Sequence, residues 1–460
     1  MRARVIPGIN VEVVKEIVPQ QLYPSGIVGL FGPAEKGQND KIKGFTSYRE
    51  IKTEYGEPEN GTLVKEAKLA FQNGVFQVFA VKVGGAASAT AIANLKAEKK
   101  PNKNIIKLVS QREGEQGNSL RIRITKGGTQ NYVTLEVLDE THPERTETHG
   151  DLVMDPSSER YLVKWLNTNS ALVKAEAIGE PALENPPVEQ DVRFEGGKAE
   201  KPDIKNYEQA LEQLELEPNI DVVYGCDEGE PQIHNLVKAH CENMSTSSEG
   251  GTLGPRLGIG SVAKGDTIED IVRKNQIVSD RFILVAPHGF AAAVAGLISK
   301  LNYFDSPTFK PLNLVESFED RYTPSQQMKL LESGVLPVDL IRGRGVVVVK
   351  GITSSKEQIS VQRVADHGIR GVKNIADDFI GMLNNARGRM ALRERIAEFF
   401  ISMEKEGALV PSTDGLKPAY VVDVYASEDD FSKGIVRVGI GMRPVRAMDF
   451  IYATINVQAF

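Results

Sequence analysis

Both ends of this 460-residue chain carry short runs in which apolar residues occupy every second position. Near the start, Ile9, Val11 and Val13 alternate with Asn10 and Glu12 after a Pro-Gly turn. A period of two is typical of a strand with one buried face. Such a strand must pair within its own domain or with another chain, because an open apolar edge invites pairing. The pattern alone leaves both outcomes open.

The C-terminus repeats this pattern in two runs separated by Pro444. In the first run, over residues 436–443, apolar residues alternate with Arg and Gly. The second run presents two faces, one with Ile451, Ala453, Ile455 and Val457, and one with Phe450, Tyr452, Thr454 and Asn456. The sequence therefore predicts a strand arm at each end, over residues 1–25 and 436–460.

Between the arms, the pattern divides the chain into four stretches. Residues 26–90 combine two buried strands with a helical patch, and residues 91–185 are rich in alternating runs, which predicts a β domain. Residues 190–340 alternate helical patterns with short apolar runs such as 220–224 and 282–285, which indicates an α/β layer fold. Residues 341–435 open with a strand and continue with two helices, expected over 356–383 and 389–406 and ended by Gly407.

Three basic residues of the first of these helices, Arg363, Arg370 and Lys373, share one face by their spacing of seven and three. The whole chain has 55 Lys and Arg against 62 Asp and Glu, a net charge of −7. A local basic face in an acidic chain is a candidate docking surface for an acidic partner. A solvated helix face is an equal alternative from the pattern alone.

The motifs that carry enzyme chemistry are incomplete. The glycines of residues 32–37 have phosphate-loop spacing, but Gln38 and Asn39 stand where Lys and Ser/Thr are needed, so a turn is favoured. The two cysteines, Cys226 and Cys241, lack zinc-site spacing and are expected to be buried thiols in a reducing compartment. The sequence thus predicts no catalytic, cofactor-binding or metal-binding residues.

One histidine keeps an enzyme hypothesis open. His288 lies between Pro287 and Gly289 after an apolar run, a position where α/β enzymes often place active-site residues. No partner for it is evident, so an α/β hydrolase built on His288 is the alternative function.

Membrane and nucleic-acid partners are not expected. The longest apolar stretch, residues 290–298, is far shorter than the roughly 20 residues that a bilayer requires. The start of the chain lacks the pattern of a signal peptide, and the acidic balance disfavours non-specific nucleic-acid binding. We expect a soluble protein made in a cytoplasm, without membrane insertion.

Ordered motifs along almost the whole chain resemble the tail sheath family of contractile phage tails and phage-derived injection particles. Residues 7–13 (PGINVEV) resemble its P-G-V-x-V-E start, and residues 114–120 (GEQGNSL) its G-x-x-G-N-x-L signature. One departure is that Arg446 and Ala447 stand where the family commonly has a second proline. The other matching pieces are 25–37, 45–56, 70–74, 78–83, 194–197, 207–211 and 434–451.

The resemblance implies a multidomain α+β and α/β fold. It implies a C-terminal polymerisation domain (341–435) with terminal strand arms (1–25 and 436–460), an N-terminal α/β segment (26–90), a β-sandwich-like outer domain (91–185), and an α/β domain of subtilisin-like topology (190–340). The arms would add strands to sheets of neighbouring subunits through main-chain hydrogen bonds. The arm residues are then Ile9, Val11, Val13, Phe450, Ile451, Ala453, Ile455 and Val457.

The resemblance also implies partners and a location. The chain would form a helical sheath of stacked, hexameric rings around a tail tube, with baseplate and tail terminator proteins, and contract to drive the tube through a cell envelope. It would reside in a virion or particle tail assembled in the bacterial cytoplasm. The Arg363, Arg370 and Lys373 face is assigned to the tube contact. A non-contractile tail tube or baseplate protein is the remaining alternative.

Overall fold

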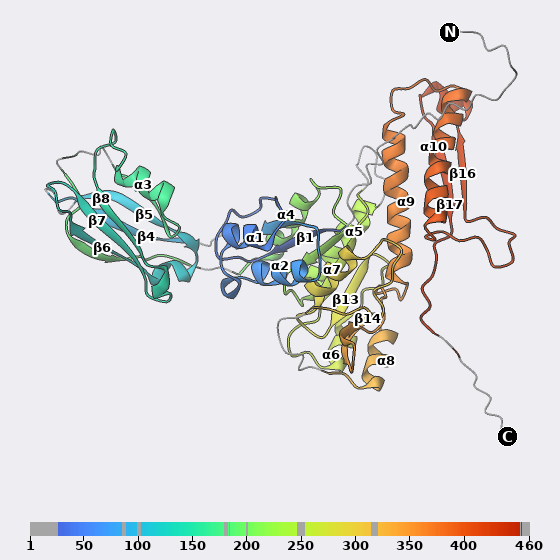
Figure 1. The fold of residues 1–460 in the computed structure, drawn as a ribbon, viewed down its shortest axis with the longest axis horizontal. Coiled ribbons are helices and arrows are strands. Elements are labelled where there is room, and N and C mark those ends of the chain that lie inside the picture. The colour runs from blue at the N-terminus through green and yellow to red at the C-terminus, as the bar shows by residue number, and fades with distance from the viewer. Residues whose placement is uncertain are drawn as a thin grey trace, which may run out of the picture.

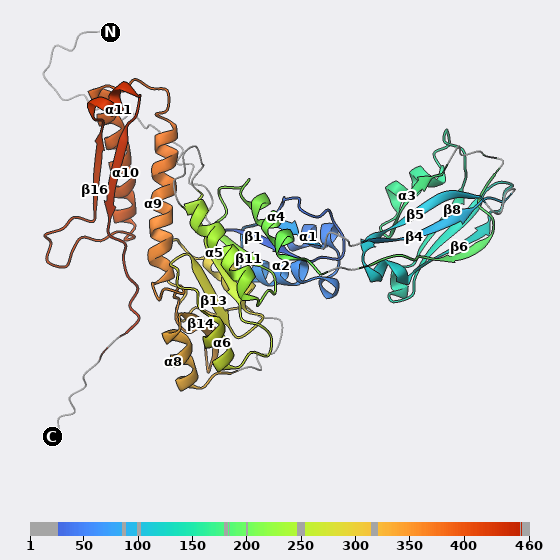
Figure 2. The ribbon, with the colours of Figure 1, turned by 180° about the vertical axis from the view of Figure 1, so that it is seen from behind.

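The computed structural model describes residues 26–84, 89–98, 103–178, 183, 185–198, 201–245, 254–313, 321–450 and 452. They form three units along the long axis of the molecule, with an α/β unit in the middle, a β-rich unit at one end, and two long helices with a hairpin at the other (Figure 1). The view from behind gives the same order (Figure 2). The predicted mixed, multidomain fold with several sheets is confirmed. The arm residues Ile9, Val11, Val13, Ile451, Ala453, Ile455 and Val457 lie outside the described residues.

The middle unit is built on one sheet with the strand order β15-β14-β13-β12-β11-β1-β3-β2. Its inner strands run parallel, whereas β2 and β15 pair antiparallel at the two edges. The strands of parallel sheets are buried on both faces, which explains their continuous apolar sequences. The bounds are Ile27–Gly32 (β1), Lys43–Phe45 (β2), Gln77–Lys82 (β3), Val222–Gly225 (β11), Leu257–Ser261 (β12), Phe282–Ala286 (β13), Val335–Ile341 (β14) and Gly345–Val348 (β15).

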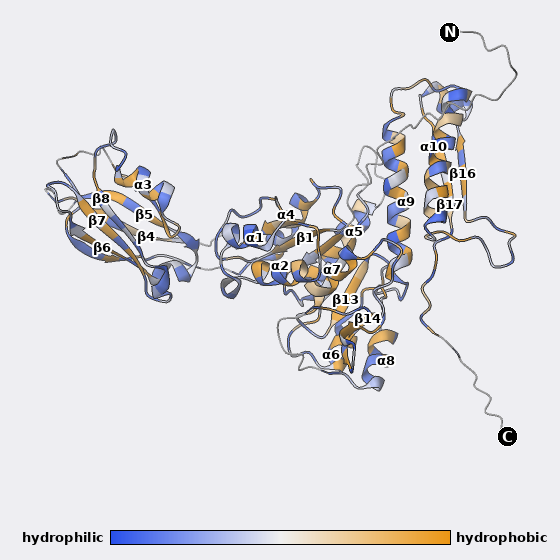
Figure 3. Ribbon diagram, in the orientation of Figure 1, coloured by the Kyte–Doolittle hydropathy of each residue, from blue (hydrophilic) through white to orange (hydrophobic). Residues whose placement is uncertain are grey.

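This sheet joins two stretches that are far apart in the sequence. β1 lies between β3 and β11, with Val28 paired to both Val78 and Val222. Residues of the predicted segments 26–90 and 190–340 therefore share one sheet. One face packs against α1 (Tyr48–Tyr55), α2 (Thr62–Gln72) and α7 (Ala291–Lys300), and the other against α4 (Ile204–Leu214), α5 (Pro231–Ser245), α6 (Ile268–Lys274) and α8 (Pro324–Glu332). The strands between these helices are the most apolar part of the unit (Figure 3).

The β-rich unit consists of two antiparallel sheets that share one apolar core. It extends past residue 185, because β10 pairs with β6. Two of its arginines contact the middle unit. Nε of Arg112 lies 2.6 Å from Glu35, and Arg145 lies 3.7 Å from both Glu35 and Glu57. Arg112 is also held within its own unit by Asp139, at 2.7 Å from Nη1. The elements are β4 (Thr90–Lys96), β5 (Asn104–Glu113), β6 (Leu120–Lys126), β7 (Val133–Asp139), β8 (Glu147–Leu152), α3 (Leu162–Asn169), β9 (Val173–Ala177) and β10 (Gln190–Arg193).

The third unit places a two-stranded hairpin against two long helices. The helices are α9 (Ile359–Asp377) and α10 (Ala386–Lys405), and the hairpin strands are β16 (Tyr420–Tyr425) and β17 (Arg437–Met442), joined by the short α11 (Glu428–Ser432). Gly407, just after α10, has a φ of 81°, which fits its predicted role at the helix end. The core residues include Val364, Leu392, Ile396, Phe400, Met403 and Val422.

Candidate assembly site

Helix α9 separates the middle unit from the hairpin unit and packs against both. Gly371 lies so close to Phe399 of α10 that a Cβ atom would come within 2.1 Å of its ring. A Cβ at Gly368 would come within 2.8 Å of Met442 in β17. These two glycines allow α9 to approach the hairpin unit closely. The polar face of α9 is turned the other way, toward the middle unit.

Arg363 lies on that polar face and is buried, with 8% of its surface exposed. Its guanidinium donates to the carbonyl oxygens of Asn302 (2.8 Å) and Leu301 (3.0 Å) at the end of α7. These carbonyls have no partner within α7, so the arginine caps that helix. Burial lowers the pKa of Arg363 to about 10. Arg363 therefore faces the interior of the molecule.

Arg370 lies seven residues further along the same face and pairs with Asp221. It also donates to the carbonyl oxygens of Pro255 and Ile220, the latter at 3.0 Å. Burial alone would raise the pKa of Asp221, but Arg370 and two backbone N–H groups lower it overall. Asp221 is thus held as a carboxylate.

Asp366 lies between these two arginines and pairs with Arg281 of the middle unit. Both residues are buried, and burial raises the pKa of Asp366 against the opposing effect of Arg281. Asp221, Pro255 and Arg281 all precede parallel strands of the sheet, so α9 lies along the edge formed by the amino ends of these strands.

The three predicted basic residues do not form a shared exposed face. Arg363 and Arg370 are occupied inside the molecule, whereas Lys373 is partly exposed and lies 3.5 Å from Asp377. The tube contact assigned to them stays a prediction. Two functional residues were missed, namely Asp221, which pairs with Arg370, and Arg281, which pairs with Asp366. The signal for an ionic face was Asp366, an acid three and four residues from the two arginines on the same face.

The β16–β17 hairpin has open edges. β16 and β17 pair antiparallel from Tyr420–Met442 to Tyr425–Arg437, and within the described parts of the chain neither strand has another strand neighbour. A two-stranded hairpin is marginal in water, and here α10 supports one face. In the described chain no strand pairs with either outer edge, although one outer carbonyl of β16, that of Val422, accepts a hydrogen bond from Nε of Arg393 at 3.2 Å. Val421 and Tyr425, on the face away from α10, are 57% and 48% exposed.

The chain that follows β17 is fixed to the start of α9. Arg446, at the position where the resemblance expects proline, forms two bonds to Glu357 at 2.8 and 3.0 Å. Gln358 bonds to both Ala447 and Asp449. Phe450, a predicted arm residue, is 70% exposed, with Lys350 5.0 Å from its ring. Residues 437–449 of the predicted C-terminal arm (436–460) thus bond within this chain, through β17 and at the start of α9.

The carboxyl ends of the strands hold the predicted enzyme candidate, His288. Its Nδ1 lies 2.9 Å from the carbonyl oxygen of Val262 and its Nε2 lies 2.8 Å from Asp227. A carbonyl and a carboxylate only accept hydrogen bonds, so the protonated ring can donate to both partners at once. The bond to Asp227 raises the pKa of His288. Both ring nitrogens therefore lie against groups of the protein itself.

Glu66 of α2 lies in the same region and is fully buried. Among the described residues neither carboxyl oxygen has a hydrogen bond of good geometry, and the nearby Tyr224 hydroxyl only partly offsets the effect of burial on its pKa. Burial raises the pKa of Glu66 to about 8, and nearby Asp227 adds to this effect. Glu66 is therefore mainly a neutral acid at pH 7.

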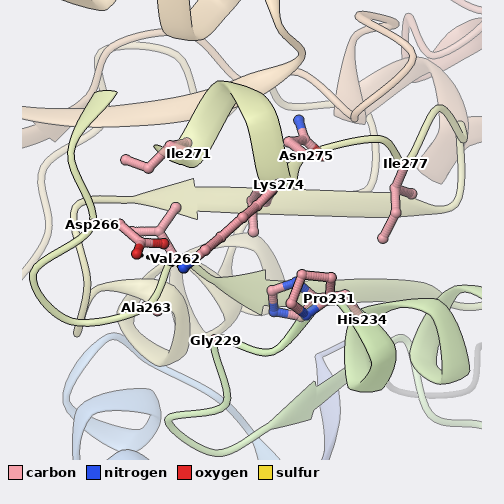
Figure 4. Close-up of a pocket in the computed structure, with 11 residues that line it drawn as sticks. Gly229, Pro231, His234, Val262, Ala263, Asp266, Ile271, Lys274, Asn275 and Ile277 are labelled. Atoms are coloured by element: carbon pink, nitrogen blue, oxygen red, sulfur yellow. Dashed lines mark hydrogen bonds and ion pairs between the residues drawn. The ribbon is translucent and has the colours of Figure 1, made fainter. Parts of the chain in front are cut away.

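A small cavity lies beside this region, between α5 and α6 (Figure 4). Its volume is about 20 Å³, enough for one water molecule and far below that of a substrate pocket. In it, Lys274 lies 2.6 Å from Asp266, and His234 is bonded to the carbonyl of Glu228. Among the described residues, no group of three or more His, Cys, Asp or Glu side chains is placed to hold a metal ion.

Two further expectations concern cysteines and membranes. Cys226 and Cys241 are buried free thiols, as predicted, and burial raises the pKa of Cys241 to about 12. Of the helices in the described ranges, none combines the length and apolarity needed to cross a membrane.

The fold is similar to those of sheath proteins of known structure. The sheath tail protein from Desulfitobacterium hafniense is similar over 90% of this chain and 93% of its own, with a TM-score of 0.64 and 14% identity. The helical sheath of the anti-feeding prophage in its contracted state matches over 99% of both chains (TM-score 0.57, 14% identity). The contracted sheath complex PVC, from an extracellular contractile injection system, matches over 99% of this chain and 98% of its own (TM-score 0.57, 13% identity).

A family comparison matches part of the chain. Residues 197–354 are similar to the phage tail sheath protein central domain. The matched range covers most of the middle unit, from before α4 to just before α9. No curated protein matches the chain.

Proposed function

We propose that this protein is the structural subunit of a contractile tail sheath. The β16–β17 hairpin carries the proposal, because it is a small sheet with open edges mounted on two helices. Main-chain groups on such edges bind added strands with affinity and register. The predicted arm strands, around residues 9–13 and 450–457, have the alternating pattern that such strands need. The family match and the shared fold support the same function.

The arms would connect neighbouring copies while each subunit rotates as a rigid body. An extended sheath would then convert to a wider, shorter one in which more surface is buried between subunits. Since the gain is summed over many copies, a modest gain in each is sufficient. The proposed partners are a tail tube, through Lys373 and the surrounding surface, and baseplate and terminator proteins. The same proposal includes hexameric rings and a location in a particle tail that is assembled in a bacterial cytoplasm. It also includes the subtilisin-like topology and a non-enzymatic role.

Removal of the arms tests this proposal. We expect purified protein to form tubes visible in electron micrographs, whereas chains lacking residues 1–25 or 451–460 stay folded and do not polymerise. The C-terminal cut is placed at 451 because residues 446–449 bond to Glu357 and Gln358. Tubes of normal yield from a chain without either arm would rule out strand exchange.

A matched pair of full-length variants tests whether a failure to assemble comes from lost strand pairing or only from a shorter chain. Serine at Ile9, Val11 and Val13 should prevent assembly, whereas serine at Asn10 and Glu12, on the opposite face, should not. Particles in which this protein forms a thick cylinder around a thinner tube would exclude the alternative of a tube or baseplate protein.

A further inference from the structure

The chain enters β1 at a residue whose position is tightly fixed. Gly26 has a φ of +108°, and a Cβ atom there would lie 2.7 Å from the carbonyl oxygen of Ser299, so only glycine fits. Its N–H donates to Oδ2 of Asp221 at 2.5 Å, and the N–H of Ile27 donates to the same oxygen at 3.1 Å. One carboxylate oxygen thus holds the first two backbone N–H groups of the described chain.

The other oxygen of Asp221 binds Arg370 on α9. The same guanidinium is fixed by the carbonyls of Ile220 and Pro255, which precede β11 and β12. Charge-assisted bonds in a mostly buried site are strong and directional. A continuous path of bonds therefore runs from Gly26 through Asp221 to α9.

The opposite side of α9 carries the hairpin unit. Gly368 and Gly371 contact Met442 of β17 and Phe399 of α10 without space for a side chain. Because close-packed contacts hold both sides of α9, a displacement of the middle unit also displaces the hairpin unit, which a flexible linker would not ensure. The start of β1 and the hairpin therefore contact opposite sides of the same helix, α9.

We propose that Arg370 and Asp221 form a latch that makes the root of the N-terminal arm and the β16–β17 hairpin move as one body. This inference rests on the proposed function, in which the arm donates a strand and the hairpin accepts one. The latch then keeps the donor root and the acceptor at a constant spacing while subunits rotate. Arg370 and Asp221 act as positioning residues for strand exchange.

Hydrogen exchange of the Gly26 and Ile27 amides tests the latch in the unassembled full-length chain. Arg370→Lys keeps the positive charge beside Asp221 but loses the planar fork that binds three acceptors. Arg363→Lys is the matched control, because Arg363 lies on the same face and bonds to Leu301 and Asn302 but not to Asp221. We expect Arg370→Lys to speed exchange of both amides by about tenfold, and Arg370→Met by more, while Arg363→Lys leaves them unchanged.

Equal exchange in the Arg370→Lys and Arg363→Lys variants would overturn the latch, because it would show only a general loosening of α9. Tube assembly provides the second readout, and Arg370→Lys should lower the yield of tubes whereas Arg363→Lys should not. Faster exchange with a normal tube yield would also overturn the positioning role. If the unaltered protein forms no tubes, the proposed function fails, whereas the exchange experiment still shows whether the bond path exists.

Discussion

The acidic residues at the two ends of β11 have different partners. Asp221 precedes the strand and Asp227 follows it. At the amino end, Asp221 faces Arg370 and belongs to a set of ionic contacts that hold α9 against the sheet. At the carboxyl end, where open α/β sheets usually bind ligands, Asp227 pairs with His288, and Glu66 is fully buried. The charged groups of the carboxyl end therefore contact one another locally, whereas those of the amino end connect the sheet to α9.

Asp221 and Glu66, at opposite ends of the sheet, should respond to pH in opposite directions. The pKa of Asp221 is lowered in the folded state, so its contribution to stability is present above the unfolded pKa of 3.8 and is lost as the pH falls. The pKa of Glu66 is raised to about 8, so the folded state is favoured at low pH and loses stability as the pH rises from 4.5 to about 8. The contribution of Asp221 is therefore sensitive to acid and that of Glu66 to base.

The largest effect is expected from removing an acid at the amino end. Asp366→Ala leaves Arg281 buried without its carboxylate, which should cost about 3–5 kcal/mol of the free energy of unfolding. Urea denaturation measures this loss. Asp377→Ala, in the same helix but with a 53% exposed side chain, should change stability by less than about 0.5 kcal/mol. A small effect for Asp366→Ala would show that α9 is held by its apolar contacts alone.

At the carboxyl end, Glu66→Gln should instead stabilise the protein at high pH. Glutamine has no proton to lose, so the fall of about 1.4 kcal/mol per pH unit that Glu66 causes between pH 4.5 and about 8 should disappear. We expect the free energy of unfolding at pH 8 to rise by about 1–2 kcal/mol. The gain is limited because the buried amide of glutamine is still a polar group removed from water. Thermal unfolding from pH 5 to 9 measures it, with the exposed Glu212→Gln as the control. An unchanged pH dependence would mean that Glu66 is ionised in the folded protein.

A smaller effect is expected from Asp227→Asn beside it. The bond to Asp227 raises the pKa of His288, so the stability it provides is complete below pH 6.5 and is lost as the pH rises through the raised pKa. The variant should move that pKa down and cost about 1 kcal/mol near pH 6. Titration of the His288 ring by NMR measures the shift. If the pKa stayed in place, the carbonyl of Val262 would be the main support of the ring.

Much of this arrangement follows from local sequence. Continuous apolar runs predicted β1 and β13, alternation predicted β6, β7 and β17, and Gly407 correctly predicted the end of α10. The insertion of β1 between β3 and β11 could not be predicted, because parallel partners distant in sequence leave no local pattern. Residues 89–198 separate β3 from β11 in the sequence, but they form a separate unit and do not enter the sheet.

The assembly site was predicted only in part. The spacing of Arg363 and Arg370 correctly placed them on one face, but burial depends on what packs against that face. Their acceptors are mostly backbone carbonyls, such as those of Leu301 and Ile220, which carry no sequence signal. The spacing of three basic residues predicted a docking face, whereas in the structure Arg363 and Arg370 bond to groups inside the molecule.

The smallest effect should come from removing the β-rich unit altogether. The chain enters and leaves it side by side, where Ala89 and Lys198 exchange two main-chain bonds of 2.9 and 3.0 Å. A short Gly-Ser linker can therefore replace residues 90–197 without moving the ends. Glu35 would lose Arg112 and Arg145 but keep the N–H of Glu57 at 2.8 Å and gain solvent. Calorimetry should show the remaining units unfolding within a few degrees of their original temperature, because the excised unit has an apolar core of its own. A large drop would show that the pairs of Arg112 and Arg145 with Glu35 and Glu57 stabilise the sheet as strongly as the contacts of α9 do.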